Sequence, residues 1–426
     1  MNIREQAAIL KQDSIQMAVL PLEKRNQALH AVAKALTEKK EEILSANRKD
    51  LSIAEENQIA MPILKRLKFD EAKLQGVIDG IEELIKLPDP LFKLQLSREL
   101  DEGLELYRET CPIGVIGVIF ESRPDALVQI ATLCLKSGNC AILKGGSEAM
   151  YTNRALFETI HQAVVANGLP EGCMAQAELR SEINELLECD QYVDLLIPRG
   201  SNEFVRYIMD HTKIPVMGHA DGICHIYVDE TFDLETAIPV IVDSKTQYVA
   251  VCNAVETLLV NRKAANELLP ALAKALREKN VEIRGTKEVR EIIECATADE
   301  EDFKTEYLDY IISVKLVDSM EAAVSHINQY GSHHTDCIVT QDMERAKRFM
   351  QLVDSAGVYC NCSTRFADGF KYGFGAEVGV STGKLHARGP VGLEGLVTYK
   401  YKLFGKGHIV DDYATGKKQF HFKPLS

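Results

Sequence analysis

Apolar residues recur at helical intervals through roughly the first 95 residues of the chain. In QALHAVAKALTEKKEEIL (residues 27–44), leucine, valine and isoleucine keep the spacing of one helix face, and charged residues occupy the other face. This pattern predicts a helical N-terminal region. The period then changes at 97–110, where two short runs flank turn-forming residues and the second run alternates apolar and polar positions, which predicts a β-hairpin.

From Cys111 the pattern becomes an alternation of buried strands and helices. Continuous apolar runs are typical of buried parallel strands, and Pro124 suits the first turn of a helix, where its missing N–H is not needed. The expected strands are PIGVIGVIF, CAILK and YVDLLIP, and the expected helices cover 124–139 and 148–168. This order predicts an α/β fold with a parallel, doubly wound sheet that has helices on both faces.

A second cycle of the same kind follows a boundary near residue 229. Its expected strands are HIYVD, ETLLV, YIISVKLV and DCIVT, and its expected helices lie near 232–242, 263–279, 286–295, 319–329 and 342–354. We interpret this cycle as a second α/β domain. The tail from Phe366 is rich in glycine and short of helix, which is typical of backbone that turns sharply or approaches a ligand closely.

Composition and charge restrict the classes of partner. Of the 426 residues, 46% are hydrophobic and 26% are charged, as in globular proteins of more than one domain. A formal net charge of −14 disfavours nucleic acid, whose partners need a basic face. The sequence has no apolar leader and no apolar run long enough for a bilayer, and its eleven scattered cysteines are odd in number. We therefore expect a cytoplasmic protein that binds neither nucleic acid nor membrane.

Two junctions between a strand and a helix combine cations with glycines. One contains Lys144, Gly145, Gly146 and Ser147, and the other contains Arg199, Gly200 and Ser201. Backbone N–H groups at such junctions bind anions at the carboxyl edge of an α/β sheet. Each junction alone fits a plain turn equally well, because neither has the spacing of a Walker or GxGxxG motif. Together they predict a phosphate-bearing ligand without identifying it.

Five further polar residues have a structural interpretation and a functional one. Ser122 and Arg123 end the first strand of the α/β region, where a surface loop with a salt bridge is as good an interpretation as a site. Arg365, His386 and Arg388 lie among the glycines of the tail, where cations can hold a carboxylate or a phosphate by paired hydrogen bonds.

Histidines and cysteines elsewhere do not have the spacing of a metal site. The residues that suggest one are His219, Asp221, Cys224 and His225. They lack the repeated short spacing of zinc ligands, so we expect a turn into a strand and no metal. His333 and His334 are expected to lie in a loop.

Cys252 has small and apolar neighbours in VAVCNAVETLLV, and Asn253 follows it directly. By composition alone, a thiol in this setting is more often part of a core than a nucleophile. No histidine or lysine adjoins it. Any activating group must therefore come from backbone dipoles or from residues distant in sequence.

Several segments together resemble the γ-glutamyl phosphate reductases, a family of the aldehyde dehydrogenase superfamily. In order between about residues 110 and 405, they are VIGVIFESRPDA, LKGGSEA, DLLIPRGS, GHADGICHIYVD, VCNAVETLLV, STRFADGFKYGFGAEVGVST and HARGPVGLEGL. The blocks ESRPD and HARGPVGLEGL are highly specific to that family. The resemblance implies an aldehyde dehydrogenase-like fold with a doubly wound cofactor-binding domain, a second α/β catalytic domain and an oligomerisation hairpin.

The resemblance also implies how the chain is divided and that it forms a homo-oligomer, either a dimer or a tetramer. The implied cofactor-binding domain comprises 1–97 and 112–228, and the implied catalytic domain comprises 229–362. The hairpin and tail comprise 98–111 and 395–426, while 363–394 returns to the active-site cleft.

By the same resemblance, Cys252 is the nucleophile of a reductase in proline biosynthesis. Its thiolate attacks the acyl phosphate of L-glutamate 5-phosphate and expels phosphate, and NADPH reduces the resulting thioester to L-glutamate 5-semialdehyde. Hydrolytic aldehyde dehydrogenases have a glutamate before the nucleophile to activate water, whereas the corresponding GHADGICH has none. We therefore expect water to be excluded. The candidate oxyanion donors are the backbone N–H of Cys252 and the side chains of Ser122 and Asn253.

A site for NADP or NADPH is implied as well. Lys144, with Gly145 and Gly146 beside it, would contact the adenosine ribose or its phosphate; Gly200 and Ser201 would contact the pyrophosphate; and Glu377 would contact the nicotinamide ribose. Where the family pattern LKGGKEA has a lysine, this chain has Ser147. NADP is therefore the expected cofactor, with one cation fewer to hold its 2′-phosphate.

The implied substrate carries two anionic groups, an α-carboxylate and a phosphate. Arg123, Arg365, His386 and Arg388 lie in blocks shared with the family, and we expect them to hold these anions, without assigning one to the other. The sequence does not decide whether a γ-glutamyl kinase associates with the chain to deliver this labile substrate.

Two alternatives remain open from the sequence. A CoA-acylating aldehyde dehydrogenase would use the same thioester chemistry with another acyl acceptor. A cysteine hydrolase would pair Cys252 with a distant histidine such as His386. The dinucleotide junctions argue against the hydrolase, and the tail blocks argue against the CoA enzyme.

Overall fold

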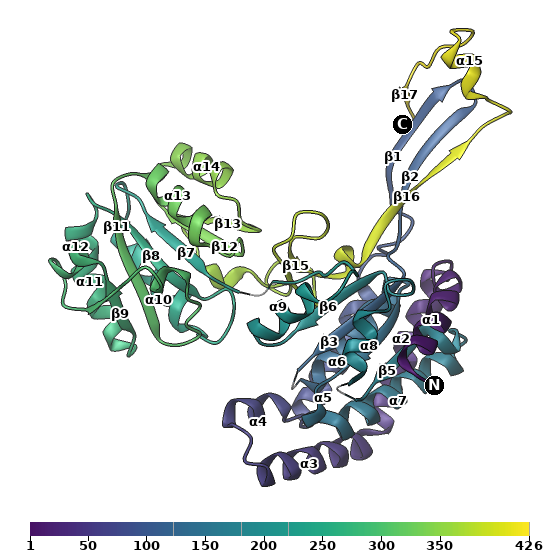
Figure 1. The fold of residues 1–426 in the computed structure, drawn as a ribbon, viewed down its shortest axis with the longest axis horizontal. Helices are drawn as coiled ribbons and strands as arrows, with labels where there is room; N and C mark the ends of the chain where they lie inside the picture. Colours follow the sequence, from purple (N-terminus) through teal and green to yellow (C-terminus); the bar gives the residue numbers. More distant parts are fainter. Residues whose placement is uncertain (122, 180, 220, 426) are drawn as a thin grey trace.

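The N-terminal region is helical, as predicted. The computed structural model describes residues 1–121, 123–179, 181–219 and 221–425, so Ser122 lies outside the described residues. Helices α1 to α5 span Ile3–Met17, Leu22–Glu38, Lys40–Glu56, Met61–Leu67 and Glu71–Lys86 (Figure 1). Leu29, Val32 and Leu36 are fully buried on the face of α2, which packs against α5, α6 and α7. Helical spacing therefore identified the buried face correctly.

A four-stranded parallel sheet with the order β5-β4-β3-β6 forms the centre of the first α/β domain. Its strands are β3 Val115–Phe120, β4 Cys140–Lys144, β5 Met174–Ala177 and β6 Leu195–Arg199. Its connecting helices are α6 Pro124–Lys136, α7 Met150–Ala166 and α8 Ser181–Leu187, and α9 Asn202–Asp210 follows β6. β5 was not predicted, because four residues with mixed polarity give too weak a pattern.

The direction of the connections decides which face each helix covers. From β3 to β5 the chain moves steadily toward one edge, and from β5 to β6 it returns past β3 to the other edge. Because such crossovers are right-handed, α6 and α7 cover one face while α8 covers the opposite face, where α1 contacts it. The predicted doubly wound sheet is confirmed. Its order reverses between β3 and β6, which is where ligands bind at the carboxyl edge of such sheets.

The second α/β domain contains a seven-stranded sheet in the order β10-β9-β11-β8-β7-β12-β13, and all of its strand pairs are parallel. The strands, β7 to β13, span Cys224–Val228, Val255–Asn261, Glu282–Gly285, Ala296–Thr297, Ile311–Val317, Thr335–Val339 and Gly357–Cys360. The helices, α10 to α14, span Leu234–Thr246, Ala265–Glu278, Lys287–Arg290, Met320–Tyr330 and Met343–Leu352. The predicted second α/β unit is confirmed.

One predicted helix of this domain is wrong over most of its length. The helix expected at 286–295 is the four-residue α12, Lys287–Arg290. The chain has to turn back after it so that β10 can pair beside β9, and Ala298 N–H donates to the carbonyl of Gly285 at 2.9 Å. Sheet pairing therefore outweighs the helical propensity of this segment.

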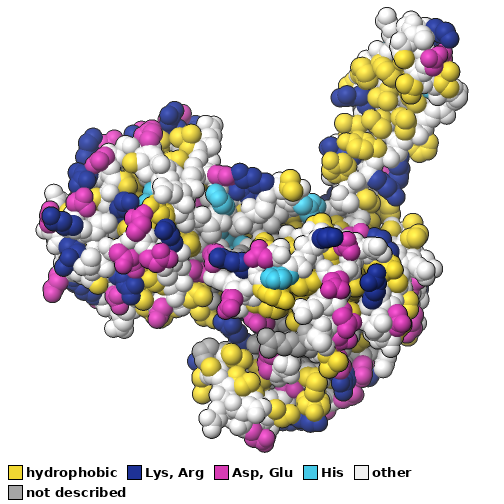
Figure 2. Space-filling model, in the orientation of Figure 1, with side chains coloured by type: hydrophobic (Ala, Val, Ile, Leu, Met, Phe, Trp, Pro, Cys, Tyr) yellow, Lys and Arg dark blue, Asp and Glu magenta, His cyan; other side chains and the backbone are white. Residues whose placement is uncertain are grey.

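A four-stranded antiparallel arm projects from the first domain (Figure 1). The predicted hairpin is β1 Leu94–Asp101 with β2 Leu104–Pro112, and Gly103 at its turn has a φ of +73°, a left-handed conformation that favours glycine. β16 Val397–Phe404 pairs with β2, and β17 Lys423–Pro424 pairs with β1. Apolar side chains gather on the visible face of the arm in Figure 2. Tyr401, Leu403 and Phe404 are each more than half exposed.

The glycine-rich tail lies between the domains before it reaches the arm (Figure 1). It forms single helical turns at Thr364–Phe366 and Leu393–Leu396 and a small hairpin of β14 Gly379–Ser381 and β15 Gly389–Val391. The five-residue α15, Val410–Ala414, follows β16. Within the described residues, no helix has both the length and the apolar character needed to cross a membrane.

A buried ion pair spans the two ends of the loop that carries Cys252. Lys245 lies near the end of α10, Glu256 lies near the start of β8, and both side chains are fully buried with Nζ and Oε2 2.6 Å apart. Burial lowers the pKa of Lys245 and raises the pKa of Glu256, because both charges are removed from water. The attraction between them offsets that cost and fixes the separation of α10 and β8.

Breaking this pair should destabilise the second domain. Lys245→Met leaves Glu256 buried without its cation, and we expect the free energy of unfolding to fall by about 3–5 kcal/mol. The exposed pair Arg262–Asp318, 2.7 Å apart, provides a matched control, and Arg262→Met should leave the urea midpoint close to that of the parent. Urea unfolding of the two variants side by side tests this; equal midpoints would contradict it.

Candidate active site

The loop between α10 and β8 presents Cys252 as a half-buried thiol. Its turn is closed by a hydrogen bond from Ala254 N–H to the carbonyl of Val251 at 3.1 Å. Cys224 donates its thiol to the carbonyl of Cys252 at 3.2 Å. Gly222 lies directly against the same backbone, because a Cβ on it would be 2.3 Å from the Cα of Cys252. Because residue 222 has no side chain, the segment that precedes β7 can contact the cysteine loop.

Asn253 connects the cysteine loop to the tail. Its Nδ2 donates to the carbonyl of Ala367 at 2.9 Å, its Oδ1 accepts from the guanidinium of Arg365, and its carbonyl accepts from Thr364 Oγ1 at 2.7 Å. Arg365 also donates through Nε to Gln247 Oε1 at 2.9 Å. A residue predicted only as an oxyanion donor thus also positions the tail over the loop.

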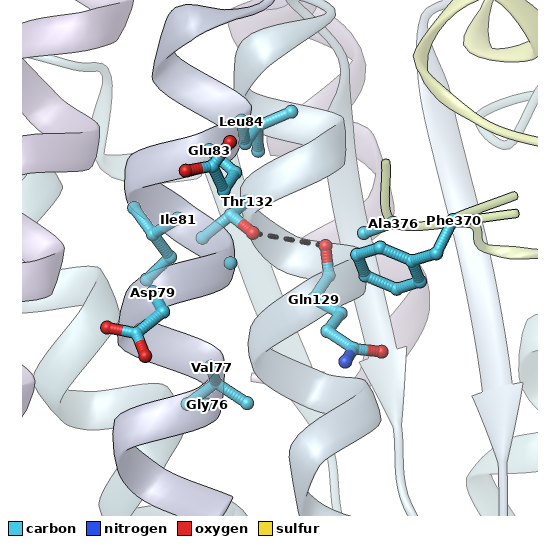
Figure 3. Close-up of a pocket in the computed structure, with 11 residues that line it drawn as sticks. Gly76, Val77, Asp79, Ile81, Glu83, Leu84, Gln129, Thr132, Phe370 and Ala376 are labelled. Atoms are coloured by element: carbon cyan, nitrogen blue, oxygen red, sulfur yellow. Dashed lines mark hydrogen bonds between the residues drawn. The ribbon is translucent and has the colours of Figure 1, made fainter. Parts of the chain in front are cut away.

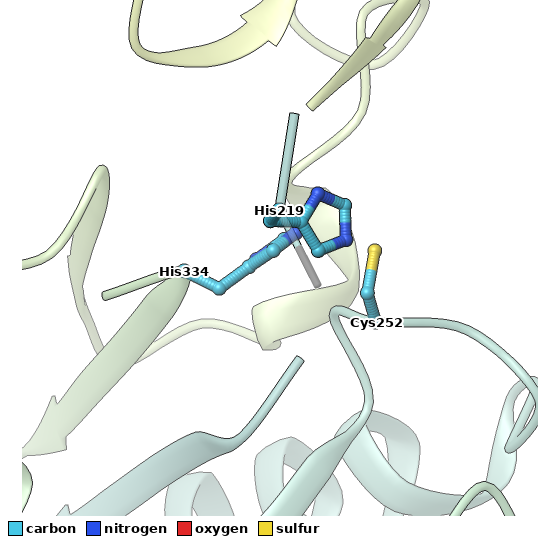
Figure 4. A group of neighbouring side chains, drawn as sticks. All are labelled: His219, Cys252 and His334. Atoms are coloured by element: carbon cyan, nitrogen blue, oxygen red, sulfur yellow. The ribbon is translucent and has the colours of Figure 1, made fainter. Parts of the chain in front are cut away.

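Two histidines from distant segments meet Cys252 (Figure 4). One ring nitrogen of His219, one of His334 and Sγ of Cys252 all lie within 4.8 Å of one another. The two rings pack edge to face with centroids 4.8 Å apart. The sequence assigned His334 to a loop without a role and His219 to a turn. His219 precedes β7, and His334 precedes β12, the strand that pairs with β7. Their proximity becomes apparent only from the strand order.

The two histidine rings have different hydrogen bonds. Nδ1 of His219 lies 2.9 Å from the carbonyl of Val380, and a carbonyl only accepts, so Nδ1 carries the proton and Nε2 has the lone pair. Burial lowers the pKa of His219 and favours its neutral form. Nδ1 of His334 lies 2.9 Å from Thr335 Oγ1, and its buried Nε2 has no hydrogen-bond partner among the described residues.

Two arginines bring positive charge to the thiol. Burial lowers the pKa of Arg199, at the end of β6, and its other electrostatic neighbours include Arg123, Glu377 and Cys252. Burial likewise lowers the pKa of Arg365, and Cys252 is the first of the groups that oppose this effect. The charges of both guanidiniums therefore act on the sulfur. Arg199, which the sequence placed only in a glycine junction, belongs to the same site.

Two of the other predicted anion-binding residues, His386 and Arg388, have protein partners of their own. Arg123 is exposed ahead of α6. His386 is exposed, with Nε2 3.0 Å from the carbonyl of Gly395. Arg388 donates to Asp354 Oδ1 at 3.1 Å, and the carbonyl of Asp354 accepts from His333, the residue before His334. Arg388 is therefore linked through Asp354 to the segment that carries His334.

The residues that first suggested a metal site take part in different contacts. His219 lies beside Cys252 and His334, as described above. His225 lies 3.0 Å from Asp336, and Asp221 accepts from Arg206 and from Asn202. Asp221 precedes β7, whereas Cys224 and His225 are the first two residues of that strand.

Both glycine junctions lie at the carboxyl edge of the first sheet. Lys144 ends β4, is buried, and bonds to the carbonyl of Gly145; burial lowers its pKa, while the carboxylates of Glu148, Glu182 and Glu178 oppose this effect. A Cβ on Gly145 would be 2.2 Å from the Asn153 amide. The side chain of Asn153 can therefore lie this close to the backbone of the junction only because residue 145 has no side chain.

Carboxylates already occupy the two helix N-termini beside these junctions. Asp50 accepts from the N–H groups of Tyr151 and Thr152 in the first turn of α7, at 3.1 and 2.7 Å. Glu121 accepts from Ser201 N–H at 3.0 Å, at the start of α9. A pyrophosphate at Gly200 and Ser201 would have to displace Glu121, a competitor that the sequence did not indicate.

Glu377 follows Ala376, a residue that lines a separate cavity. It accepts from Gly369 N–H at 2.8 Å, and burial raises its pKa. Next to it, Ala376 and Phe370 close one side of a cavity of about 230 Å³ between α5 and α6, where the hydroxyl of Thr132 donates to the carbonyl of Gln129 (Figure 3). None of the residues around Cys252 lines this cavity. It is a space beside the site and not the site itself.

Known proteins share this fold and these segments. A model of the aldehyde dehydrogenase family matches residues 3–290. A γ-glutamyl phosphate reductase of Acetivibrio thermocellus is 61% identical over 426 residues, which are 100% of this chain and 99% of that protein. The chain belongs to the γ-glutamyl phosphate reductases. A crystal structure of a γ-glutamyl phosphate reductase from Thermotoga maritima has a TM-score of 0.93 at 39% identity, over 95% of this chain and 99% of that one.

Membership of this family confirms the resemblance and the fold that the sequence predicted. Like other aldehyde dehydrogenase family members, the chain is an oxidoreductase that uses a nicotinamide cofactor. A propionaldehyde dehydrogenase from Rhodopseudomonas palustris, solved with bound CoA, has a TM-score of 0.65 at 14% identity, over 94% of this chain and 96% of that one. At that identity the likeness shows the fold alone.

The contact between Gly222 and Cys252 can be tested directly. In Gly222→Ala the new methyl group has to push the Cys252 backbone away, and a displacement of about 1 Å at a reacting group costs about 100-fold in turnover. Gly218→Ala is the matched control, because its Cβ would be 3.6 Å from its nearest neighbour, Pro198. Turnover of the two purified variants should differ by that factor; equal turnover would show that the contact does not position the thiol.

Proposed function

We propose that the chain reduces L-glutamate 5-phosphate to L-glutamate 5-semialdehyde, releases inorganic phosphate and uses NADPH, as a step of proline biosynthesis. The observation that carries this proposal is the 61% identity, over its whole length, to a protein named for this substrate. The half-buried thiol of Cys252, which lies beside two histidines and interacts electrostatically with Arg199 and Arg365, supports it.

In this proposal the sulfur of Cys252 attacks the acyl carbon and the C–O bond to phosphate breaks, which leaves a thioester on Cys252. The backbone N–H of Cys252 and the amide of Asn253 stabilise the oxyanion. The absence of a glutamate in GHADGICH fits an enzyme that must not hydrolyse its own thioester.

The carboxyl edge of the first sheet fits a dinucleotide. Gly145 and Gly200 leave room where a side chain would collide with Asn153 or Glu121, and Lys144 supplies a cation. When bound there, NADPH supplies the hydride that reduces the thioester. We propose that Lys144, Gly145, Gly146 and Ser147 orient its adenosine half, that Gly200 and Ser201 hold its pyrophosphate, and that Glu377 holds its nicotinamide ribose.

The cations near Cys252 are proposed to hold the substrate. Arg365 is the best placed of them, since it bonds to Asn253 and its charge acts on the sulfur. Arg123 and Cys252 both interact electrostatically with Arg199. Arg388 and His386 bind the α-carboxylate or the phosphate from the tail, after Arg388 exchanges Asp354 for the anion.

The arm is proposed to form a homo-oligomer. Its exposed apolar residues include Phe422 and, on the edge strand β16, Tyr399, Tyr401, Leu403 and Phe404. Contiguous exposed apolar side chains of this kind are typical of an interaction surface. We also place the protein in the cytoplasm, where the eleven cysteines, all free in the described chain, remain reduced.

The proposed reaction can be run in reverse, which avoids the labile acyl phosphate. With L-glutamate 5-semialdehyde, NADP and phosphate, the absorbance of NADPH should rise only when phosphate is present, because phosphate has to cleave the thioester. Cys252→Ala should abolish the signal. Turnover without phosphate would show that water cleaves the thioester, as in a hydrolytic aldehyde dehydrogenase, and would contradict the proposal. Turnover with CoA in place of phosphate would support the CoA-acylating alternative, no reduction of NADP under any condition would support the cysteine hydrolase, and activity in the variant would remove Cys252 from the chemistry.

The cofactor preference has a separate test. Lys144 is surrounded by three carboxylates, and Ser147 adds no charge, so Ser147→Lys should strengthen the hold on a 2′-phosphate. One added charge-assisted hydrogen bond, about 1.5 kcal/mol, corresponds to roughly a tenfold lower KM for NADP with the KM for NAD unchanged. Thr297→Lys, on the exposed edge strand β10, adds the same charge in the other domain and should change neither. Equal changes for NAD and NADP would contradict the placement.

A further inference from the structure

In the proposed reaction, a base has to remove the proton from the Cys252 thiol. Neither neighbour in sequence is a base, since Val251 and Asn253 flank it. In space, the rings of His219 and His334 lie close to it, each with a nitrogen within 4.8 Å of the sulfur. The two arginines that act on the sulfur carry charge but accept no proton.

His219 has the correct tautomer to act as a base. The carbonyl of Val380 binds the proton on Nδ1, which leaves the lone pair of Nε2 as the only acceptor on the ring. Burial lowers the pKa of His219, so the ring is neutral and able to accept. The charged groups that face it are Glu306, Arg199 and Asp221, and their effects partly cancel.

His334 is less suited to this role. Its ring is fully buried and packs edge to face against the ring of His219. Its Nδ1 lies close to both Thr335 Oγ1 and, at 3.9 Å, the thiol of Cys224. We assign His334 a positioning role, in which its ring holds the ring of His219 in place.

We infer that Nε2 of His219 accepts the proton of the Cys252 thiol and passes it to the phosphate that leaves. This inference rests on the proposed function for the identity of the leaving group. A separation within 4.8 Å can be bridged by one water or by a small rotation of the thiol, as is common before substrate binds.

The proton balance closes with this assignment. The S–H bond breaks, its proton moves to His219, and the sulfur forms a bond to the acyl carbon while the C–O bond to phosphate breaks. The proton then moves from His219 to the phosphate oxygen, which leaves as hydrogen phosphate. After hydride transfer, the C–S bond breaks, the aldehyde forms and the thiolate takes one proton from solvent through His219. The cycle consumes one proton for each hydride, as reduction of an acyl phosphate to an aldehyde requires.

The test uses His219→Asn, whose side-chain N–H can still donate to the carbonyl of Val380 but which has nothing in the place of Nε2. Alkylation of Cys252 by iodoacetamide is followed from pH 5 to 10 on the full-length protein, by mass spectrometry of its peptide. At pH 7 we expect the alkylation rate to fall by about tenfold or more, because the variant has no imidazole to accept the proton of the thiol as the sulfur attacks. At pH 10 it should equal the rate of the parent.

His211→Gln is the matched control, because His211 is exposed at the end of α9 and bonds to the carbonyl of Tyr207. It should keep the pH profile of the parent. In the reverse reaction, kcat of His219→Asn should fall by about 10²- to 10⁴-fold with KM for the semialdehyde little changed. Added imidazole should restore part of the activity of His219→Ala, which a purely structural role would not allow.

The outcomes separate the two proposals. If His219→Asn alkylates with the profile of the parent, His219 is not the proton acceptor, whatever the reductase activity. If the profile moves but the parent does not reduce NADP in a phosphate-dependent way, the proton transfer stands and the proposed substrate is wrong. If His219→Asn does not fold, His219→Gln is measured in the same assay, and a profile like that of the parent again overturns the assignment.

Discussion

The active site depends on the parallel pairing of β7 with β8 and with β12. Parallel neighbours begin at the same edge of a sheet, so the segments that precede them converge there. Gly222 precedes β7, Cys252 precedes β8 and His334 precedes β12, which is why residues more than 100 positions apart meet. The residues proposed for the cofactor lie instead mainly at the carboxyl ends of β4 and β6. The two sheets thus present opposite ends, one proposed for the chemistry and one for the dinucleotide.

Charge and burial have different effects on the groups around the sulfur of Cys252. Arg199 and Arg365 bring positive charge that no proton transfer can remove, whereas burial favours the neutral form of His219. A fixed cation stabilises a thiolate once it exists, and a neutral base removes the proton that prevents it from forming. The Lys245–Glu256 pair, fully buried at both ends of the cysteine loop, adds rigidity without adding net charge.

Local patterns predicted most of the strands and helices, because alternation and helical spacing are properties of short segments. The glycine junctions were also visible, since Lys144 and Arg199 each end an apolar run. The role of His334 was not, because it depends on β12 lying beside β7, and strand order is not encoded in any single segment. Asp50 and Glu121 were missed for the same reason: each caps a helix that is distant in sequence or follows another strand. The helix expected at 286–295 failed because β10 pairs with β9.

The strands of the arm come from parts of the chain that the ribosome synthesises at very different times. β2, Leu104–Pro112, finds its partner β16 only when Val397–Phe404 has left the ribosome. Until then both edges of the β1–β2 hairpin are unpaired, because β17 follows β16 in the chain, and two exposed strands in water are marginal. The tail residues that pack against the first domain or bond to the cysteine loop, such as Leu393 and Arg365, precede β16 in the chain. The last part of the chain to be synthesised therefore completes the surface proposed for association, after the residues of the candidate site have been made.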